Sequence, residues 1–265
     1  MPFPDSPRVI YEINPLVEVI CQVRFPAILR IDSELPAGFQ DRVRDAYPIF
    51  AESGGQQQIK LNLQPPLADL LGGAGPISLR GRTNYEFVSA DRFWKVVLTR
   101  ESLALACSKY RRWEEFKRQF HIAFSVFLDL YSPQFFTRVG LRYQDVIQRN
   151  ALGLNDVEWK ELLQPHIAGE LSSQDVANHI TQSVNQTTIA LDENHGQVLI
   201  NHGLATSQEN EQCYLIDSDF STNQRTETNE VLNRLDYYNH CARRLFRWCI
   251  TDRLHDAMHP EFLSE

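Results

Sequence analysis

The chain has 265 residues, of which 43% are hydrophobic and 23% charged, as is usual for a globular protein with a large core. This length predicts one bilobed unit or two tightly joined subdomains. The formal net charge of −8 disfavours nonspecific binding to nucleic acid or to an anionic membrane. No apolar run approaches the roughly 18 residues of a membrane span, and the first residues lack a signal-peptide pattern, so we expect a cytoplasmic protein.

The five cysteines point to the same compartment. Their number is odd, they lie within apolar segments, and none forms a Cys-x-x-Cys pair: Cys21, Cys107, Cys213, Cys241 and Cys249. This pattern predicts reduced, buried thiols rather than disulfides or metal ligands. We expect no cofactor.

The first clear pattern along the chain is a strand at Leu16–Phe25. Its odd positions from residue 17 onward are apolar, whereas Glu18, Gln22 and Arg24 lie among the even positions. A period of two over this length predicts a half-buried strand. A short helix is predicted at Pro36–Tyr47.

An antiparallel meander is predicted next. Weak alternation indicates a strand at Gln56–Leu63, and the prolines and glycines of Gln64–Pro76 predict a loop. Four further strands are predicted at Ile77–Arg82, Tyr85–Ser89, Phe93–Arg100 and Leu103–Lys109. A tight turn fits Asp91-Arg92 between two of them.

The clearest helix is predicted at Arg111–Tyr131, before Pro133. Aromatic side chains recur along it at intervals of three and four residues: Trp113, Phe116, Phe120, Phe124 and Phe127. Such a stripe is typical of a helix packed on a core rather than of a cofactor pocket.

A second series of elements follows in a similar order. It starts with a strand at Phe136–Ile147, which carries Arg138, Arg142 and Gln144 on its polar face. The remaining elements are a short helix at Glu158–His166, strands at Thr187–Asp192, Gln197–His202 and Cys213–Phe220, and a long helix at Glu230–Met258.

These two series predict an α+β protein with an internal duplication. Each half, residues 1–133 and 134–265, has the order β-α-β-β-β-α, with an antiparallel sheet backed by a long helix. Val23-Arg24-Phe25 matches Leu141-Arg142-Tyr143, 118 residues later, and the same offset takes Trp113 to Val231 in the last helix. We therefore expect the halves to pack tightly about a pseudo-two-fold axis.

The segment Asn14–Pro26, with its Pro-Leu-Val-Glu-Val stretch and Arg-Phe ending, resembles the start of a sporadically distributed bacterial family of unknown function. Arg138–Tyr143, Leu215–Phe220 and Ala242–Leu254 resemble later parts of the same family. The resemblance spans nearly the whole chain and implies no activity, cofactor or catalytic residue. The patchy distribution of the family implies genes in defence or mobile-element loci, which is association rather than chemistry.

The least ordinary feature is a group of arginines on the two equivalent strands. Arg24, Arg138 and Arg142 occupy polar faces, and Glu18 shares the face of Arg24. If the halves share a sheet, these side chains converge and can bind a carboxylate or a phosphate. The alternative is cross-strand ion pairing on an open face of the sheet.

Asp217 and Asp219 form a second candidate site, because residues two apart on a strand face the same side. Two carboxylates can hold a divalent cation. The alternative is a solvated strand face. His195, His202, His255 and His259 are interpreted as structural or solvated, and no phosphate-binding loop, dinucleotide fingerprint or nucleophile elbow is found.

Without a recognisable catalytic set, the catalytic residues are unknown and we favour a binding protein over an enzyme. Its expected partner is another protein or a small anionic ligand, and a homodimer is compatible with the sequence. The alternative is a metal-dependent enzyme that acts on a phosphorylated or nucleotide substrate through Asp217, Asp219 and an arginine.

Overall fold

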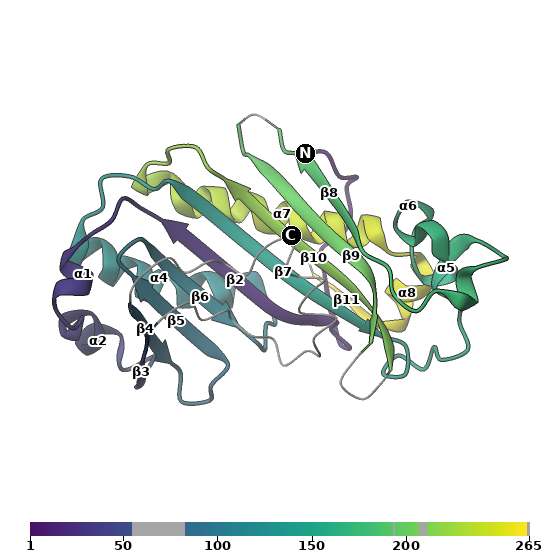
Figure 1. Ribbon diagram of the computed structural model, residues 1–265, viewed down its shortest axis with the longest axis horizontal. Coiled ribbons are helices and arrows are strands. Elements are labelled where there is room, and N and C mark those ends of the chain that lie inside the picture. Colours follow the sequence, from purple (N-terminus) through teal and green to yellow (C-terminus); the bar gives the residue numbers. More distant parts are fainter. Residues whose placement is uncertain (55–82, 193, 207–210, 264–265) are drawn as a thin grey trace.

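The computed structural model describes residues 1–54, 83–192, 194–206 and 211–263. These residues form a nine-stranded antiparallel sheet with two long helices on one face (Figure 1), which confirms the α+β class. In spatial order the strands are β3 (Ile49–Gly54), β4 (Thr83–Val88), β5 (Trp94–Thr99), β6 (Ser102–Cys107), β2 (Leu16–Arg24), β7 (Arg138–Gln148), β10 (Gln212–Thr222), β9 (Gln197–Thr206) and β8 (Asn185–Ala190). The predicted strands at 56–63 and 77–82, and the loop between them, lie outside the described residues.

The two long helices are α4 (Trp113–Tyr131) and α7 (Val231–Cys249), each of 19 residues. Glu114 and Glu115 in the first turn of α4 stabilise that end of the helix. The helix ends at Ser132, whose backbone is in the left-handed conformation just before Pro133. A reciprocal capping box between Glu227 and Glu230 precedes α7. Shorter helices lie at the two ends of the sheet: α1 (Arg30–Ser33), α2 (Ala37–Val43), α5 (Trp159–Leu162), α6 (Pro165–Ala168) and α8 (Asp252–Ala257).

The centre of the sheet is the antiparallel pair β2–β7. On their other sides, β2 pairs with β6 and β7 with β10, so both series of elements belong to one continuous sheet. The predicted boundary near residue 133 falls in the connection between α4 and β7. β3 follows the short helices of the first series and lies before the first strand predicted for the meander, so the sequence analysis did not predict it. The duplication and the division into two halves stay predictions.

A bulge at the start of β2 corrects the predicted alternation. Leu16 lies opposite Asp145, yet Glu18 lies opposite the preceding residue, Gln144, so Val17 is an extra residue in β2. Val17 consequently leaves the face expected for the odd positions and packs with a small cluster that includes Leu215 on the other side of the sheet.

The predicted helix at Glu230–Met258 is in fact two helices. α7 ends at Cys249, and Ile250 is extended and forms a β-bridge with Leu163. The backbone amide of Thr251 then donates to the carbonyl of Leu162 at 2.9 Å. The helical periodicity continues across this break, so only the hydrogen bonds to a distant segment locate it.

The two ends of the described chain meet in a second, two-stranded sheet that the sequence patterns did not predict. β1 (Val9–Tyr11) pairs antiparallel with β11 (Pro260–Phe262). The hydroxyl of Tyr11 lies 2.7 Å from Nδ1 of His255, which joins this small sheet to α8. Strands of three residues are too short to produce a detectable period.

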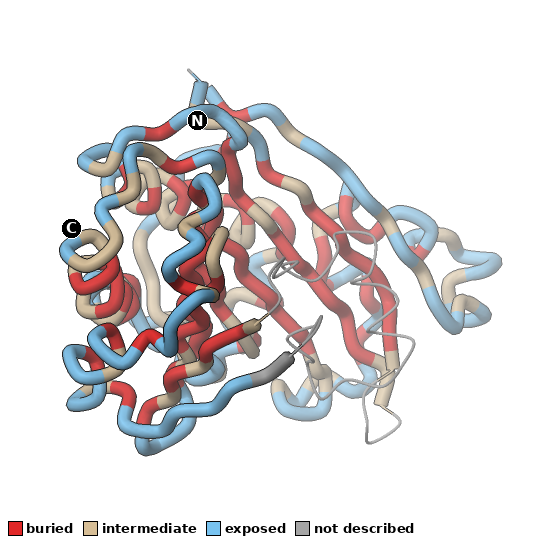
Figure 2. The backbone as a smooth tube through the Cα atoms, turned by 60° about the vertical axis from the view of Figure 1, so that its left-hand side comes forward, coloured by how far each residue is buried: buried red, intermediate tan, exposed pale blue. Residues whose placement is uncertain are grey.

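The core lies between the sheet and the long helices. Phe116, Phe120 and Phe127 of the predicted aromatic stripe are fully buried, and one continuous cluster spans both series of strands. Figure 2 shows the burial of the strands and the exposure of the connecting segments. All five cysteines are free and buried, as predicted. Within the described ranges, no helix has both the length and the apolarity needed to cross a membrane.

Candidate functional site

The predicted site residues lie together on the face of the sheet opposite the long helices. Arg142 of β7 donates two hydrogen bonds to Asp217 of β10, at 2.7 and 2.6 Å. Both side chains are buried, with exposures of 4% and 1%. Burial raises the pKa of Asp217, and the facing guanidinium of Arg142 opposes that shift. This is a fully desolvated ion pair.

A second ion pair, parallel to the first, joins Arg138 to Asp219. One guanidinium nitrogen of Arg138 lies 2.9 Å from each carboxylate oxygen. The guanidinium crosses directly above Gly140, where a Cβ atom would come within 2.1 Å of it. The missing side chain at Gly140 is therefore what allows Arg138 to reach β10.

Arg24 and Glu18 complete this face. Arg24 and Arg138 both donate to the side-chain oxygen of Gln22, at 3.2 and 3.4 Å. Burial raises the pKa of Glu18 to about 7, against the attraction of Lys95 and Arg142. The structure thus brings all of the predicted ligand-binding residues to the central strands, where Asp217 and Asp219 already neutralise two of the arginines. Binding of an external anion there stays a prediction.

The carboxylates of Asp217 and Asp219 are both held by arginines, so a metal ion would have to displace a guanidinium from each. No group of three or more His, Cys, Asp or Glu side chains arranged to hold a metal occurs among the residues that the structure describes. Metal binding by Asp217 and Asp219 therefore stays a prediction. Its energetic cost would be the loss of the two ion pairs that these carboxylates make with arginines.

The histidines have partners within the fold. His202 lies 2.7 Å from the hydroxyl of Tyr214, and His255 lies the same distance from that of Tyr11. His259 faces Glu12 at 3.2 Å. These contacts agree with the structural role expected from the sequence.

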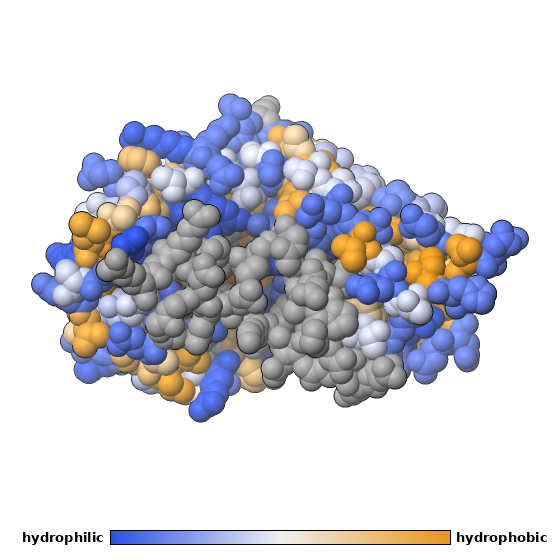
Figure 3. All heavy atoms as spheres, in the orientation of Figure 1, coloured by the Kyte–Doolittle hydropathy of each residue, from blue (hydrophilic) through white to orange (hydrophobic). Residues whose placement is uncertain are grey.

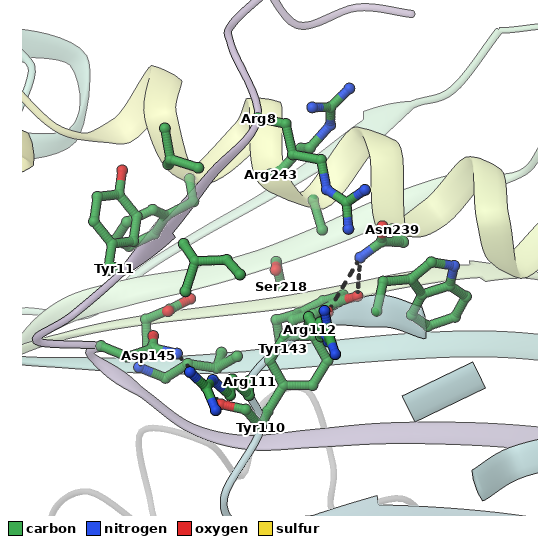
Figure 4. Close-up of a pocket in the computed structure, with 17 residues that line it drawn as sticks. Arg8, Tyr11, Tyr110, Arg111, Arg112, Tyr143, Asp145, Ser218, Asn239 and Arg243 are labelled. Atoms are coloured by element: carbon green, nitrogen blue, oxygen red, sulfur yellow. Dashed lines mark hydrogen bonds between the residues drawn. The ribbon is translucent and has the colours of Figure 1, made fainter. Parts of the chain in front are cut away.

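A different site lies on the helix side of the sheet, in a cavity of about 130 Å³ beneath β1 (Figure 4). Its walls come from β1, the start of α4, strands β7 and β10, and α7. The polar residues that line it include Tyr11, Tyr110, Tyr143, Asp145, Ser218 and Asn239, and its arginines are Arg8, Arg111, Arg112 and Arg243. We call it the Asp145 pocket.

Among the described residues that line this pocket, Asp145 is the only one with a carboxyl group. It is 7% exposed, and its carboxyl group makes no hydrogen bond or ion pair with another described side chain. Burial raises the pKa of Asp145 to about 8, and the charge of Asp217 on the other side of the sheet adds to the shift. The group is therefore mostly protonated at neutral pH, when it can both donate and accept a hydrogen bond.

The arginines give the pocket a positive charge. Arg8 pairs with Glu114 at 2.5 Å, and Arg243 contacts His240 at 2.9 Å. Arg111 and Arg112 are exposed at the start of α4. Figure 4 shows Arg8 and Arg243 beside α7, above the cavity. With Asp145 protonated, the described residues that line the cavity carry only positive charge, although Arg8 is already paired with Glu114.

The tyrosines form an ordered wall. The amide nitrogen of Asn239 donates to the hydroxyl of Tyr143 at 2.8 Å and lies 3.5 Å from that of Tyr110. The rings of Tyr110 and Tyr143 meet edge to face, with centroids 5.9 Å apart. Burial raises the pKa of both hydroxyls, so they stay protonated and act as hydrogen-bonding groups rather than as bases.

Our sequence reasoning missed this pocket, although one signal was present. In the strand β7, Asp145 falls in the same alternating series as the apolar residues Leu141 and Ile147, which face the helices. A carboxylate in register with a buried face requires either a partner or a functional reason. The arginines gave no signal, because Arg8, the pair 111–112 and Arg243 lie far apart in the sequence.

The surface outside these sites is mostly hydrophilic on the face shown in Figure 3, with apolar groups near α1–α2 and α5–α6. No family model matches the chain, and no curated protein is significantly similar to it. The family resemblance proposed from the sequence therefore stays an interpretation.

Proposed function

We propose that the protein is a binding protein for a small anionic organic molecule, which it holds in the Asp145 pocket. The observation that carries this proposal is the combination of a buried carboxyl group without a partner and four arginines around one cavity. An isolated buried polar group is costly to maintain, so it is seldom kept without a use.

The charges favour an anion. Arginine forms strong, directional hydrogen bonds with carboxylate and phosphate groups. The arginines of the other candidate site, Arg138 and Arg142, already bind carboxylates of the chain itself. In the Asp145 pocket a ligand competes with Glu114 for Arg8, and the tyrosine wall offers apolar surface for the rest of the molecule.

The test is a calorimetric titration with inorganic pyrophosphate at low ionic strength. We expect the wild type to bind it and Arg243→Gln to bind it about 10 to 150 times more weakly, which corresponds to one charge-assisted hydrogen bond of roughly 1.5–3 kcal/mol. Arg118→Gln is the matched control, because Arg118 is exposed on α4 outside the pocket. An absence of pyrophosphate binding, or equal binding by Arg243→Gln, would refute the proposal.

We also propose that the sheet arose from two related halves around an axis between β2 and β7. The equal lengths of α4 and α7, which start 118 residues apart, support this relation. Because each half alone would expose a central strand, fragments 1–133 and 134–265 should be poorly soluble separately and should associate when co-expressed. Two fragments that fold as separate monomers would contradict the expected tight packing.

A further inference from the structure

The strand β8 is the last strand at one edge of the nine-stranded sheet (Figure 1). It pairs with β9 in a continuous antiparallel register without a bulge. No described strand lies next to it on its other side. Four of its six residues are exposed, so this edge of the sheet is open to solvent.

The backbone of β8 directs alternate hydrogen-bonding groups to the open edge. Just after the strand, the amide of Leu191 donates to the carbonyl of Gly196 at 2.9 Å. Hydrogen-bonded pairs alternate along an antiparallel ladder, so the odd-numbered residues of β8 are the ones that bond to β9. The amides and carbonyls of Gln186, Thr188 and Ala190 therefore point outward, and no hydrogen bond from another described residue reaches them.

β8 lacks the features that normally protect the edge of a sheet. Edge strands usually carry lysines, a proline or a bulge, each of which discourages another strand from pairing with them. The sequence of β8, Asn-Gln-Thr-Thr-Ile-Ala, contains no charged residue and no proline. The first charged residue after it is Asp192. The edge is therefore able to accept a further strand by main-chain hydrogen bonding.

We propose that β8 is a dimer interface, at which two copies of the chain pair their β8 strands antiparallel about a two-fold axis at Thr188. The contact joins two nine-stranded sheets into one. The partner is a second copy because the strand is complementary to itself: it has no charge to repel its copy, and its outward groups match when the strand is reversed. This interface is independent of the anion-binding function, since no residue of β8 lines the Asp145 pocket.

The hydrogen bonds select the register. With the axis at Thr188, that residue lies opposite itself, and Gln186 lies opposite Ala190 of the second copy. All three outward-facing residues of each strand then have a partner, which gives about six backbone hydrogen bonds. An axis at Thr187 would instead pair Ala190 with Val184, which lies outside the strand. The register at Thr188 therefore satisfies the most donors within β8.

The charges near the interface do not oppose this register. Asp192 would lie opposite Val184, an apolar side chain that is 54% exposed. The two copies of Asp192 would be eight positions apart along the strands, about 26 Å, which is several times the Debye length at physiological salt. Because one short strand makes a small interface of the transient class, we expect dimerisation at micromolar rather than nanomolar concentrations.

The experiment is analytical ultracentrifugation of the full chain at protein concentrations up to about 0.5 mM, with charge-swap variants of Thr188. The wild type should shift from monomer to dimer as its concentration rises. Thr188→Lys and Thr188→Glu each place like charges opposite each other on the axis, and each should weaken dimerisation at least about tenfold. An equimolar mixture of these two variants places opposite charges on the axis and should restore the dimer.

Ala190→Lys is the matched control, because it adds a charge to the same outward-facing series of the strand. Its two copies would lie about 13 Å apart, beyond the Debye length at physiological salt, so dimerisation should weaken by less than about threefold. Cooperative unfolding of each variant in urea confirms that it is folded. A wild type that stays monomeric, undiminished dimerisation of Thr188→Lys, or a mixture no tighter than its two components would overturn the inference. An equal loss in Ala190→Lys would contradict the register and overturn it too.

Discussion

Neutralising Asp145 by the substitution Asp145→Asn should stabilise the protein, and increasingly so as the pH rises. Asparagine has nearly the same shape but cannot ionise. In the folded protein the pKa of Asp145 is raised from 3.8 to about 8 by burial. The folded state therefore holds one more proton than the unfolded state between those two pH values, and this difference makes the stability of the wild type fall as the pH increases.

The size of the effect follows from the shift. For each pH unit above 3.8 the free energy of unfolding of the wild type falls by about 1.4 kcal/mol. At pH 7 the ionisable carboxyl group has therefore lowered the stability by roughly 4 kcal/mol. This value is an upper estimate, because water entering the cavity would reduce it. Below pH 4 both states are protonated, and the two proteins should have similar stabilities.

The assay is urea unfolding of both proteins at several pH values from 4 to 8. Glu18 titrates in the same range, with its pKa raised by burial to about 7, but it is present in both proteins and cancels in the difference. The stability difference between variant and wild type should grow with pH. A constant difference across the range would show that Asp145 is not a buried, unpaired carboxyl group.

The paired carboxylate on the other face should behave in the opposite way. Asp217→Asn leaves Arg142 buried without its counter-ion and should destabilise the protein by about 3–5 kcal/mol in the same assay, whereas the double change Arg142→Met/Asp217→Leu should be close to neutral. A much smaller loss of stability in Asp217→Asn would contradict the conclusion that Arg142 and Asp217 form a desolvated ion pair. Gly140→Ala should cost about 1 kcal/mol, because the added Cβ displaces only the guanidinium at the end of the Arg138 side chain and so weakens its partly exposed pair with Asp219. Its control is Gly38→Ala on α2, where a Cβ meets no atom within 4 Å and no loss is expected; equal effects of the two substitutions would contradict this account.

Local patterns in the sequence were sufficient for most of the elements. The alternation of β2 after its bulge, the aromatic stripe of α4 and the turn at Asp91 each depend on neighbours within a few residues, and the structure confirms them. Patterns also placed Arg138, Arg142, Asp217 and Asp219 on polar strand faces, because side-chain direction in a strand follows from position alone.

The sequence could not reveal the contacts between distant segments. Which arginine meets which carboxylate depends on the register of β7 against β10, and Arg138 reaches Asp219 only because Gly140 lies beneath it. The break at Ile250 and the pairing of β1 with β11 likewise depend on hydrogen bonds between residues far apart in the chain.

The amino-acid sequence by itself determined the class of the fold, the positions of its two long helices and the faces of most of its strands, because these follow from hydrophobic periodicity. Only the tertiary structure decided where the chemistry gathers. It neutralised the arginines first expected to bind a ligand, and it placed four other arginines from three separate segments around Asp145. The reason is physical: a pocket is a property of surfaces brought together by packing, and no local pattern specifies which surfaces those are.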